Sequence, residues 1–266
     1  MRKEVKQFLV KIKNIKRIKK DVYLLTFLSS YLAKKAYPGN FLHLKVSSVI
    51  LRRPFSIHRI DKNDMSVLFK VKGRGTTSLA RYKKGDSLNI IGPLGNEFSF
   101  NNTSSGQHIL VAGGIGVAPL LFLAQKLNNK GENKNTILLG AKNKREIVCK
   151  KEFRNLGFQV KIATEDGSEG YKGFVTSLLQ NILNTQYSRL NTNIYACGPK
   201  EMFLKIHKVV KKFPNIKCQV SFEQFMGCGL GVCCACTINT KQGYKKVCKD
   251  GPVFCYQDIK DIKGIL

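Results

Sequence analysis

Two hydrophobic patterns divide the chain, and the first of them covers residues 7–100. Short runs there alternate apolar and polar positions and are separated by turn residues, which is typical of half-buried antiparallel strands. The five runs lie at 8–12, 21–27, 40–46, 65–71 and 87–91. Short strands at this spacing predict a small antiparallel barrel, and the glycines at 92 and 95 predict a tight turn over 91–96 at its end.

The second pattern begins after a polar segment at 101–106. Apolar runs predict strands at 108–112, 136–141, 158–163 and 193–197, and helical spacing predicts helices at 120–127, 147–156, 175–183 and 200–212. This alternation predicts a doubly wound parallel sheet with helices on both faces. Such sheets bind ligands at the carboxyl ends of their strands, where the segments 113–116, 164–167 and 197–199 fall.

Five of the nine cysteines lie between residues 228 and 248. Cys228, Cys233 and Cys236 have C-x4-C-x2-C spacing, and Cys248 follows as a fourth candidate ligand. Plant-type ferredoxins hold a 2Fe–2S cluster with this pattern. Neighbouring glycines at 227, 229 and 231 allow backbone N–H groups to approach the sulfur atoms closely. We therefore expect an iron–sulfur cluster, and interpret Cys234, which is off the pattern, as a spare thiol.

A structural zinc site and a disulfide knot are the alternatives for these cysteines. Zinc sites usually pair their cysteines in two short knuckles, whereas here the fourth cysteine stands alone. With the two hydrophobic patterns, the cysteines predict three domains. These are a β-barrel at 1–100, an α/β nucleotide domain at 101–218 and a small cluster domain at 219–266.

Three short motifs could bind phosphate or flavin. Arg53 and Ser56 of the Arg-Pro-Phe-Ser motif can offer a guanidinium and a hydroxyl from a proline-stiffened turn while the backbone is held extended, although this motif alone is weak evidence. The segment 73–80 leads from glycines into a Thr/Ser helix cap that could bind a pyrophosphate, or is an ordinary turn. The glycines of 113–116 connect a strand to a helix, as in dinucleotide sites, and Pro119 suits the first turn of that helix.

Composition narrows the choice of partners. The chain has 266 residues, 43% of them hydrophobic, and a formal net charge of +29. Because the lysines are spread along the whole chain, we expect no nucleic-acid partner, although the charge favours anionic nucleotides or an acidic protein. No uncharged apolar run of about 18 residues occurs, and the crowded cysteines suit a reducing compartment, so we expect a cytoplasmic protein outside the membrane. The histidines at 43, 58, 108 and 207 are scattered and are interpreted as structural or surface residues.

The order of the motifs is more specific than any one of them. Arg-Pro-Phe-Ser, Gly-x-Gly-Thr, Gly-Gly-x-Gly-x-x-Pro and Cys-Gly-Pro follow one another along the chain. This order resembles the ferredoxin-NADP reductase superfamily over essentially the whole chain, which implies FAD on the barrel and NAD(P)H on the α/β domain. With the C-terminal cysteines and the phrase at 247–254, the chain is most similar to the electron-transfer subunits of NAD-dependent (class 1B) dihydroorotate dehydrogenases.

The resemblance implies a role for each motif. FAD would be bound by Arg53, Pro54, Phe55, Ser56, Leu68, Phe69, Lys70, Gly75 and Thr76. NAD would be bound by Gly113, Gly114, Gly116, Gly198 and Pro199, with Cys197 as the catalytic residue near the nicotinamide. The alternative for Cys197 is a small buried residue at a strand end that serves only packing. Cys228, Cys233, Cys236 and Cys248 would ligate the cluster. NAD rather than NADP rests on the resemblance alone, because 140–145 lacks an acidic residue for the ribose.

In this family the partner is an FMN-containing catalytic subunit that oxidises dihydroorotate, and two copies of each subunit form a heterotetramer. NAD exchanges a hydride and an iron–sulfur cluster exchanges single electrons, so FAD is expected between them. A small flavin subunit of an NADH-dependent ferredoxin:NADP reductase, or of a sulfide dehydrogenase, is the nearest alternative. A zinc-binding protein without redox activity is the alternative from another class.

Overall fold

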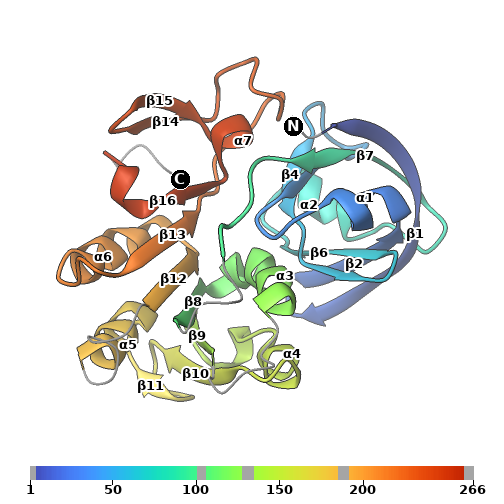
Figure 1. Ribbon diagram of the computed structural model, residues 1–266. Coiled ribbons are helices and arrows are strands. Elements are labelled where there is room, and N and C mark those ends of the chain that lie inside the picture. Colours follow the sequence, from blue (N-terminus) through green and yellow to red (C-terminus); the bar gives the residue numbers. More distant parts are fainter. Residues whose placement is uncertain (1–3, 101–105, 128–134, 185–191, 261–266) are drawn as a thin grey trace.

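An antiparallel sheet of seven strands forms the first part of the protein (Figure 1). The computed structural model describes residues 4–100, 106–127, 135–184 and 192–260. The strands are β1 (Lys6–Lys19), β2 (Val22–Leu28), β3 (Phe41–Lys45), β4 (Arg53–Ser56), β5 (Arg59–Asp61), β6 (Asp64–Lys70) and β7 (Ser87–Leu94), in the order β4-β3-β7-β1-β2-β6-β5. Two short helices, α1 (Ser30–Lys35) and α2 (Arg74–Leu79), connect them.

The predicted barrel is confirmed as a curved, open sheet. All five predicted strands are present, and alternate residues such as Leu25, Phe27, Leu42 and Leu44 fill its core. The strands β4 and β5 are the two edges of the sheet. Arg53–Ser56 forms strand β4, so the expected turn is replaced by a strand, whereas the extended backbone expected there is present; Pro54 is tolerated since an edge strand does not need every N–H group.

The tight turn predicted at 91–96 was also misplaced. Strand β7 continues through Pro93 to Leu94, and the positive φ of +73° is found at Gly95. The backbone N–H of Asn96 then donates to the Gly251 carbonyl (2.7 Å), which ties the end of the barrel to the C-terminal segment. The Asn96 side chain makes two further bonds there, to the Asp250 carbonyl (2.7 Å) and from the Val253 N–H (3.1 Å).

A second sheet of seven strands follows in the order β11-β10-β9-β8-β12-β13-β16. The strands are β8 (Gln107–Gly113), β9 (Thr136–Ala141), β10 (Gln159–Thr164), β11 (Tyr171–Lys172), β12 (Thr192–Cys197), β13 (Lys217–Ser221) and β16 (Val253–Cys255). The first six are parallel, and β16 is antiparallel to β13. The polar segment expected at 101–106 lies, except for Gly106, outside the described residues.

Helices cover both faces of this sheet, which confirms the doubly wound prediction. The helices are α3 (Val117–Leu127), α4 (Lys150–Asn155), α5 (Val175–Ile182) and α6 (Lys200–Val210), with short 3-10 helices η1 (Gly114–Gly116) and η2 (Lys144–Glu146). Leu120 and Phe153 belong to the core on one face, whereas Leu179 and Phe203 belong to the core on the other. None of the helices in the described part of the chain is long and apolar enough to cross a membrane.

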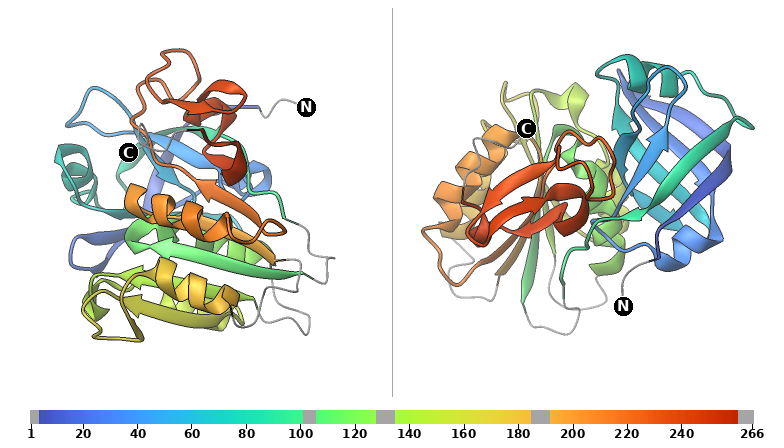
Figure 2. Two further views of the ribbon diagram at one scale, coloured as in Figure 1. Left: turned by 90° about the vertical axis from the view of Figure 1, so that its left-hand side faces the viewer. Right: turned by 90° about the horizontal axis from the view of Figure 1, so that it is seen from above.

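The C-terminal segment packs on both preceding units. It comprises the hairpin β14 (Thr237–Thr240) and β15 (Gly243–Lys246), helix α7 (Val247–Asp250), strand β16 and the 3-10 helix η4 (Tyr256–Asp258). Seen from above in Figure 2, it lies between helix α6 and the barrel. Strand β13 spans the predicted boundary at 218, and β16 adds the C-terminal segment to the second sheet, so the second and third predicted domains are joined by shared strands.

Side-chain hydrogen bonds fix the barrel against the second sheet. The His58 ring Nδ1 lies 2.8 Å from the Ala118 carbonyl at the start of α3. Gln125, further along α3, accepts from the Ile60 N–H (3.2 Å) and donates to the Ile60 carbonyl (3.1 Å). The Gln125 side chain thus satisfies backbone groups on the free edge of β5. Together with the His58 contact, it holds the barrel and the second sheet in one orientation.

Candidate functional site

The four predicted cluster ligands lie around one irregular loop between β13 and β14. The Cys228 sulfur accepts backbone N–H groups of Leu230 (3.3 Å), Val232 (3.3 Å) and Cys233 (3.4 Å). The loop can wrap a sulfur atom in this way because Gly229 and Gly231 have φ of +70° and +82°, which favours glycine. Backbone donors aimed at sulfur are what a ligating thiolate requires.

The four cysteines form two pairs. In the first pair, the Cys228 N–H donates to the Cys233 sulfur (3.4 Å), and the Cys233 N–H donates to the Cys228 sulfur. In the second pair, the Cys248 N–H donates to the Cys236 sulfur (3.4 Å). The Gly231 N–H donates to the Cys248 sulfur (3.1 Å) and connects the pairs. Four thiolates in two pairs fit the two irons of a 2Fe–2S cluster. Within the described residues, no three His, Cys, Asp or Glu side chains gather as they would around a single metal ion.

The two ends of this ligand set differ in acidity. Burial alone would raise the pKa of Cys228, but the N–H groups of Cys233, Leu230 and Val232 outweigh it and lower the pKa to about 6. Burial and the adjacent Cys236 thiol raise the pKa of Cys248 to about 12. The backbone N–H groups therefore favour the thiolate form of Cys228, whereas burial and Cys236 favour the protonated thiol of Cys248.

The remaining cysteines are not part of the ligand set. Cys234 is exposed, and its thiol is directed at the Val232 carbonyl (3.6 Å), which agrees with a spare thiol. All nine cysteines lie in the described residues and all are free, so the disulfide alternative is wrong.

The loop also packs on the barrel, through a contact that the sequence did not suggest. His43 on β3 is fully buried, and a Cβ added at Gly229 would lie 2.5 Å from its Nδ1. On the neighbouring strand His43 faces Pro54 of the predicted flavin motif. Burial lowers the pKa of His43 to about 4, and the charges of Arg52 and Arg53 act in the same direction. The cluster loop thus packs on β3, the strand that pairs with the flavin strand β4.

The predicted flavin residues come together where β4, β6 and α2 meet. The Arg53 side chain packs against Gly75, since a Cβ there would lie 3.5 Å from Cγ and Nε of Arg53. Phe55 and Phe69 form an edge-to-face pair with centroids 5.6 Å apart. Ser56 lies opposite Phe41 in the β3–β4 ladder. Most of the predicted set therefore shares one region of the barrel.

The two neighbours of Phe69 on β6 face the second sheet. Leu68 is buried in the core that contains Val117 and Ala118 of α3, and Lys70 pairs with Glu146 (3.8 Å). They therefore lie at the junction of the two sheets, where a flavin has to meet a nicotinamide.

The helix cap of α2 differs from the sequence prediction. The N-cap is Gly73, not a Ser or Thr, and the Thr76 hydroxyl is occupied by the turn, where it accepts the N–H groups of Lys72 (2.9 Å) and Gly73 (3.2 Å). First-turn N–H groups of a helix have no intrahelical partner. A phosphate at this position would thus be bound by backbone N–H groups and not by the Thr76 hydroxyl.

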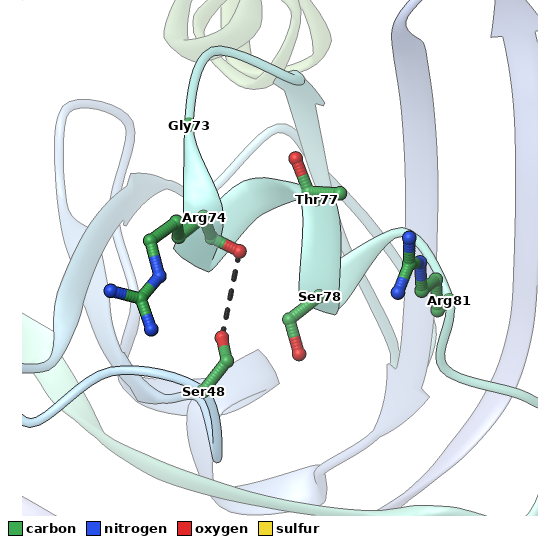
Figure 3. A pocket seen from close by; sticks show the side chains of 6 residues that line it. All are labelled: Ser48, Gly73, Arg74, Thr77, Ser78 and Arg81. Atoms are coloured by element: carbon green, nitrogen blue, oxygen red, sulfur yellow. Dashed lines mark hydrogen bonds between the residues drawn. The ribbon is translucent and has the colours of Figure 1, made fainter.

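A hollow of about 360 Å³ adjoins this turn (Figure 3). It is lined by Ser48, Gly73, Arg74, Thr77, Ser78 and Arg81. In Figure 3 the Arg74 and Arg81 side chains lie on opposite sides of the helix, and Ser48 approaches from the loop before β4, with its hydroxyl 3.5 Å from the Arg74 carbonyl. Two guanidinium groups and three hydroxyls suit the phosphates and sugar of a nucleotide. Of these residues, the sequence indicated only the helix turn itself.

The two predicted nucleotide motifs meet at the carboxyl ends of β8 and β12. A Cβ at Gly116 would lie 2.5 Å from the Cys197 carbonyl carbon and 2.6 Å from the Gly198 nitrogen. A Cβ at Gly113 would lie 2.7 Å from Pro199 Cδ. Gly114 has a φ of +54° and would meet nothing within 4 Å, so its backbone is open to a ligand.

Cys197 itself is almost fully buried. Burial raises its pKa well above that of a free thiol, and the carboxylate of Glu223 acts in the same direction. The thiol is thus protonated at neutral pH and is not a nucleophile. Glu223 is exposed at the end of β13 and was not indicated by the sequence, because a single carboxylate between a strand and the cysteine loop has no motif of its own.

Comparison with known proteins follows the same division of the chain. Residues 223–260 match the iron-sulfur cluster binding domain of dihydroorotate dehydrogenase B, and residues 110–208 match the oxidoreductase NAD-binding domain. A curated relative from Caldanaerobacter subterraneus subsp. tengcongensis, "Dihydroorotate dehydrogenase B (NAD(+)), electron transfer subunit", is 39% identical over 250 residues, which cover 92% of this chain and 94% of the relative.

Two solved structures share the fold. One is the NADH-dependent reduced ferredoxin-NADP oxidoreductase, studied for flavin-based electron bifurcation, with a TM-score of 0.84, 28% identity, and coverage of 95% of this chain and 90% of that one. The other is ferredoxin-NADP+ reductase from Plasmodium falciparum, with a TM-score of 0.66, 17% identity, and coverage of 79% and 94%. The second likeness concerns the fold alone.

Proposed function

We propose an electron path for this chain, which belongs to the family of the electron transfer subunits of dihydroorotate dehydrogenase B. Electrons pass from the FMN of a catalytic subunit through a 2Fe–2S cluster and FAD to NAD. The resemblance drawn from the motif order is confirmed by that membership. The iron–sulfur domain match makes the zinc alternative wrong. The observation that carries the proposed path is the packing of the cluster loop on β3, at Gly229 and His43, because β3 pairs directly with the flavin strand β4.

Each cofactor has a fitting set of residues. FAD exchanges single electrons on one side and a hydride on the other when bound. The Arg53 guanidinium and the first-turn N–H groups of α2, at Gly75 and Thr76, are suited to its pyrophosphate, and the hollow beside Arg74 and Arg81 to the remaining part of the nucleotide. The flavin ring would lie along Pro54, Phe55 and Ser56 of β4 and Leu68, Phe69 and Lys70 of β6.

NAD would bind where the turn at 113–116 meets the turn at 197–199. The open backbone at Gly114 and the start of α3 point toward the pyrophosphate position of a dinucleotide. Gly198 and Pro199 then support the nicotinamide, with the protonated Cys197 thiol next to it. The role of this thiol is to position the ring, since it cannot act as a nucleophile or a base in its protonated form.

The surface around the cluster loop supports a protein partner. Phe225, Val232 and Tyr244 are 74%, 77% and 78% exposed, and Leu230 is 49% exposed. Phe225, Leu230 and Val232 belong to the loop between β13 and β14, and Tyr244 belongs to β15. Exposed apolar side chains of this size are typical of a protein interface. The partner proposed for this face is the FMN-containing catalytic subunit, in a cytoplasmic heterotetramer with two copies of each chain.

Anaerobic purification with the catalytic subunit, followed by visible absorption during titration with NADH and with dihydroorotate, tests the proposal. Both reductants should bleach the flavin and cluster bands of the complex, whereas NADH alone should bleach those of the isolated chain. The proposal fails if dihydroorotate never reduces the chain in the complex.

The likeness to the NADH-dependent reduced ferredoxin-NADP oxidoreductase favours a second candidate, a subunit of that kind of enzyme. Reduced ferredoxin and NADPH, added to the same preparation, separate the two. Reduction by NADPH with ferredoxin, but not by dihydroorotate, would select this second candidate.

A further inference from the structure

His43 lies on the outer face of the barrel, toward the cluster. Along β3, Leu42 and Leu44 point into the barrel core, while Phe41 belongs to the core that contains Cys236 and Cys248. Side chains alternate along a strand, so His43 points to the same side as Phe41. The imidazole is nevertheless 0% exposed, because the loop at Gly229 covers it.

The ring nitrogens of His43 lie near the backbone of Cys228 and Arg52, but their geometry does not make a hydrogen bond with either. Among the described residues, neither Nδ1 nor Nε2 of His43 has a hydrogen bond, and the only other atom in the same situation is Oδ1 of Asp64. Buried polar side-chain atoms in folded proteins nearly always have a partner. A neutral imidazole carries one N–H donor and one acceptor nitrogen, so a buried ring of this kind indicates a missing acceptor close to it.

The buried ring can offer an N–H donor to an acceptor beside it. Its own backbone is held in place by Arg52, whose Nη1 donates to the His43 carbonyl (3.3 Å). The N–H groups around Cys228 show that this loop directs donors toward sulfur, and sulfur atoms of ligating thiolates and of a bound cluster are hydrogen-bond acceptors.

We propose that His43 is a positioning residue that joins the cluster loop to β3, beside the flavin strand β4, with its ring donating an N–H hydrogen bond to a sulfur atom of the bound 2Fe–2S cluster or its ligands. The proposal rests on the proposed function for the presence of the cluster, but not on the identity of the partner subunit. Gly229 is required to be glycine because any side chain there would displace the ring. Hydrogen bonds to the sulfur atoms raise the reduction potential of the cluster. His43 would therefore favour transfer of an electron onto the cluster, which lies beside the flavin strand.

Selective labelling tests this in the unaltered protein. Wild-type protein containing ¹⁵N-histidine is purified with its cofactors, reduced with dithionite and measured by pulsed EPR of the reduced cluster. We expect a coupling to histidine nitrogen, which disappears in His43→Leu and stays in His108→Leu, a control that removes another buried histidine, on β8. Absence of histidine coupling in wild-type protein with a full cluster would overturn the proposal.

The cluster potential gives a second readout. His43→Leu should make the reduction potential of the cluster more negative by about 59 mV, which is a tenfold change in the one-electron equilibrium constant. The FAD content should not change. His43→Gln, which keeps a donor, should recover part of the shift, and it also serves if His43→Leu does not fold. A potential in both variants equal to that of wild type would refute the role. None of these readouts involves dihydroorotate, so they are independent of the test of the proposed function.

Discussion

The backbone of Cys197 lies directly against Gly116: the Cys197 carbonyl carbon is 2.5 Å from the position that a Cβ of residue 116 would take. This contact brings together the ends of β8 and β12, which are adjacent parallel strands. Ligands of doubly wound sheets bind at this edge. The shape of the proposed NAD site therefore depends on a contact between two backbones, and not on one side chain.

Gly116→Ala should consequently weaken NADH binding. The new methyl group would collide with backbone atoms of residues 197 and 198, which cannot rotate away as a side chain can, so the two turns must separate. We expect the KM for NADH to rise about tenfold or more, measured by NADH oxidation with ferricyanide as electron acceptor. FAD and cluster absorption of the same sample serve as the control for folding, and an unchanged KM would contradict the assigned site.

The sequence predicts the features that depend on neighbouring residues better than those that depend on contacts between distant segments. Strand β9 (Thr136–Ala141) has the predicted bounds, because a buried strand is a local run of apolar residues. The cluster cysteines are also local, apart from Cys248. In contrast, β5 and α1 have three and six residues, too few for a hydrophobic period, and were not predicted.

Contacts between distant segments were not predictable from a local pattern. His43 and Gly229 meet only because the loop after β13 folds over β3, and β16 joins β13 from the far end of the chain. The strand character of Arg53–Ser56 has the same cause, since its pairing with β3 overrides the local preference of proline for a turn. The hollow beside α2 depends on Ser48 from a separate loop.

Cys228→Ser should abolish cluster binding and leave FAD in place. The Cys228 sulfur is the centre of three backbone N–H bonds, and a serine oxygen is a poor substitute for a thiolate ligand of iron. The measurement is iron and acid-labile sulfide content together with visible absorption. Cys234→Ser is the matched control, six residues away in the same loop, and should keep the full cluster. A full cluster in Cys228→Ser would remove this residue from the ligand set.

Arg53→Ala should weaken FAD binding. Its guanidinium is the positive group that packs on Gly75, and hydrogen bonds to charged groups contribute about 1.5–3 kcal/mol, which corresponds to a loss of roughly tenfold to a hundredfold in affinity. Fluorescence titration of FAD into deflavinated protein measures the dissociation constant. Arg17→Ala, an exposed arginine of β1 that bonds only to the nearby Lys19 carbonyl, is the control among the described contacts. Equal FAD affinity of both variants would contradict the role of Arg53.

Cys197→Ala should slow hydride transfer without loss of cofactors. The thiol is buried and protonated, so its contribution is to hold the nicotinamide in place, and a smaller residue leaves the ring less constrained. We expect flavin reduction by saturating NADH in stopped-flow measurements to slow about tenfold. Cys218→Ala removes a thiol that is also buried, on the adjacent strand β13, and should react at the wild-type rate. Equal rates for the two variants would assign Cys197 to packing only.

His58 should make the junction of the two sheets sensitive to acid. Burial lowers the pKa of His58 to about 4, while in the unfolded chain it keeps its ordinary value near 6.5. Between these two values the unfolded state binds more protons, so the free energy of unfolding falls as the pH falls. The stability that the neutral ring preserves is complete above about pH 6.5, and about 1 kcal/mol of it is lost by pH 5.5.

Urea denaturation at pH 7.5 and pH 5.5, in the presence of excess FAD, measures this loss. His58→Gln should lose less stability between the two pH values than wild type, because the amide does not titrate and can still donate to the Ala118 carbonyl. His207→Gln, at an exposed position on α6, should retain the wild-type pH dependence. If His58→Gln shows the same loss as wild type, protonation of another group weakens the protein in acid, and the His58 ring does not limit the stability of the junction between the barrel and α3.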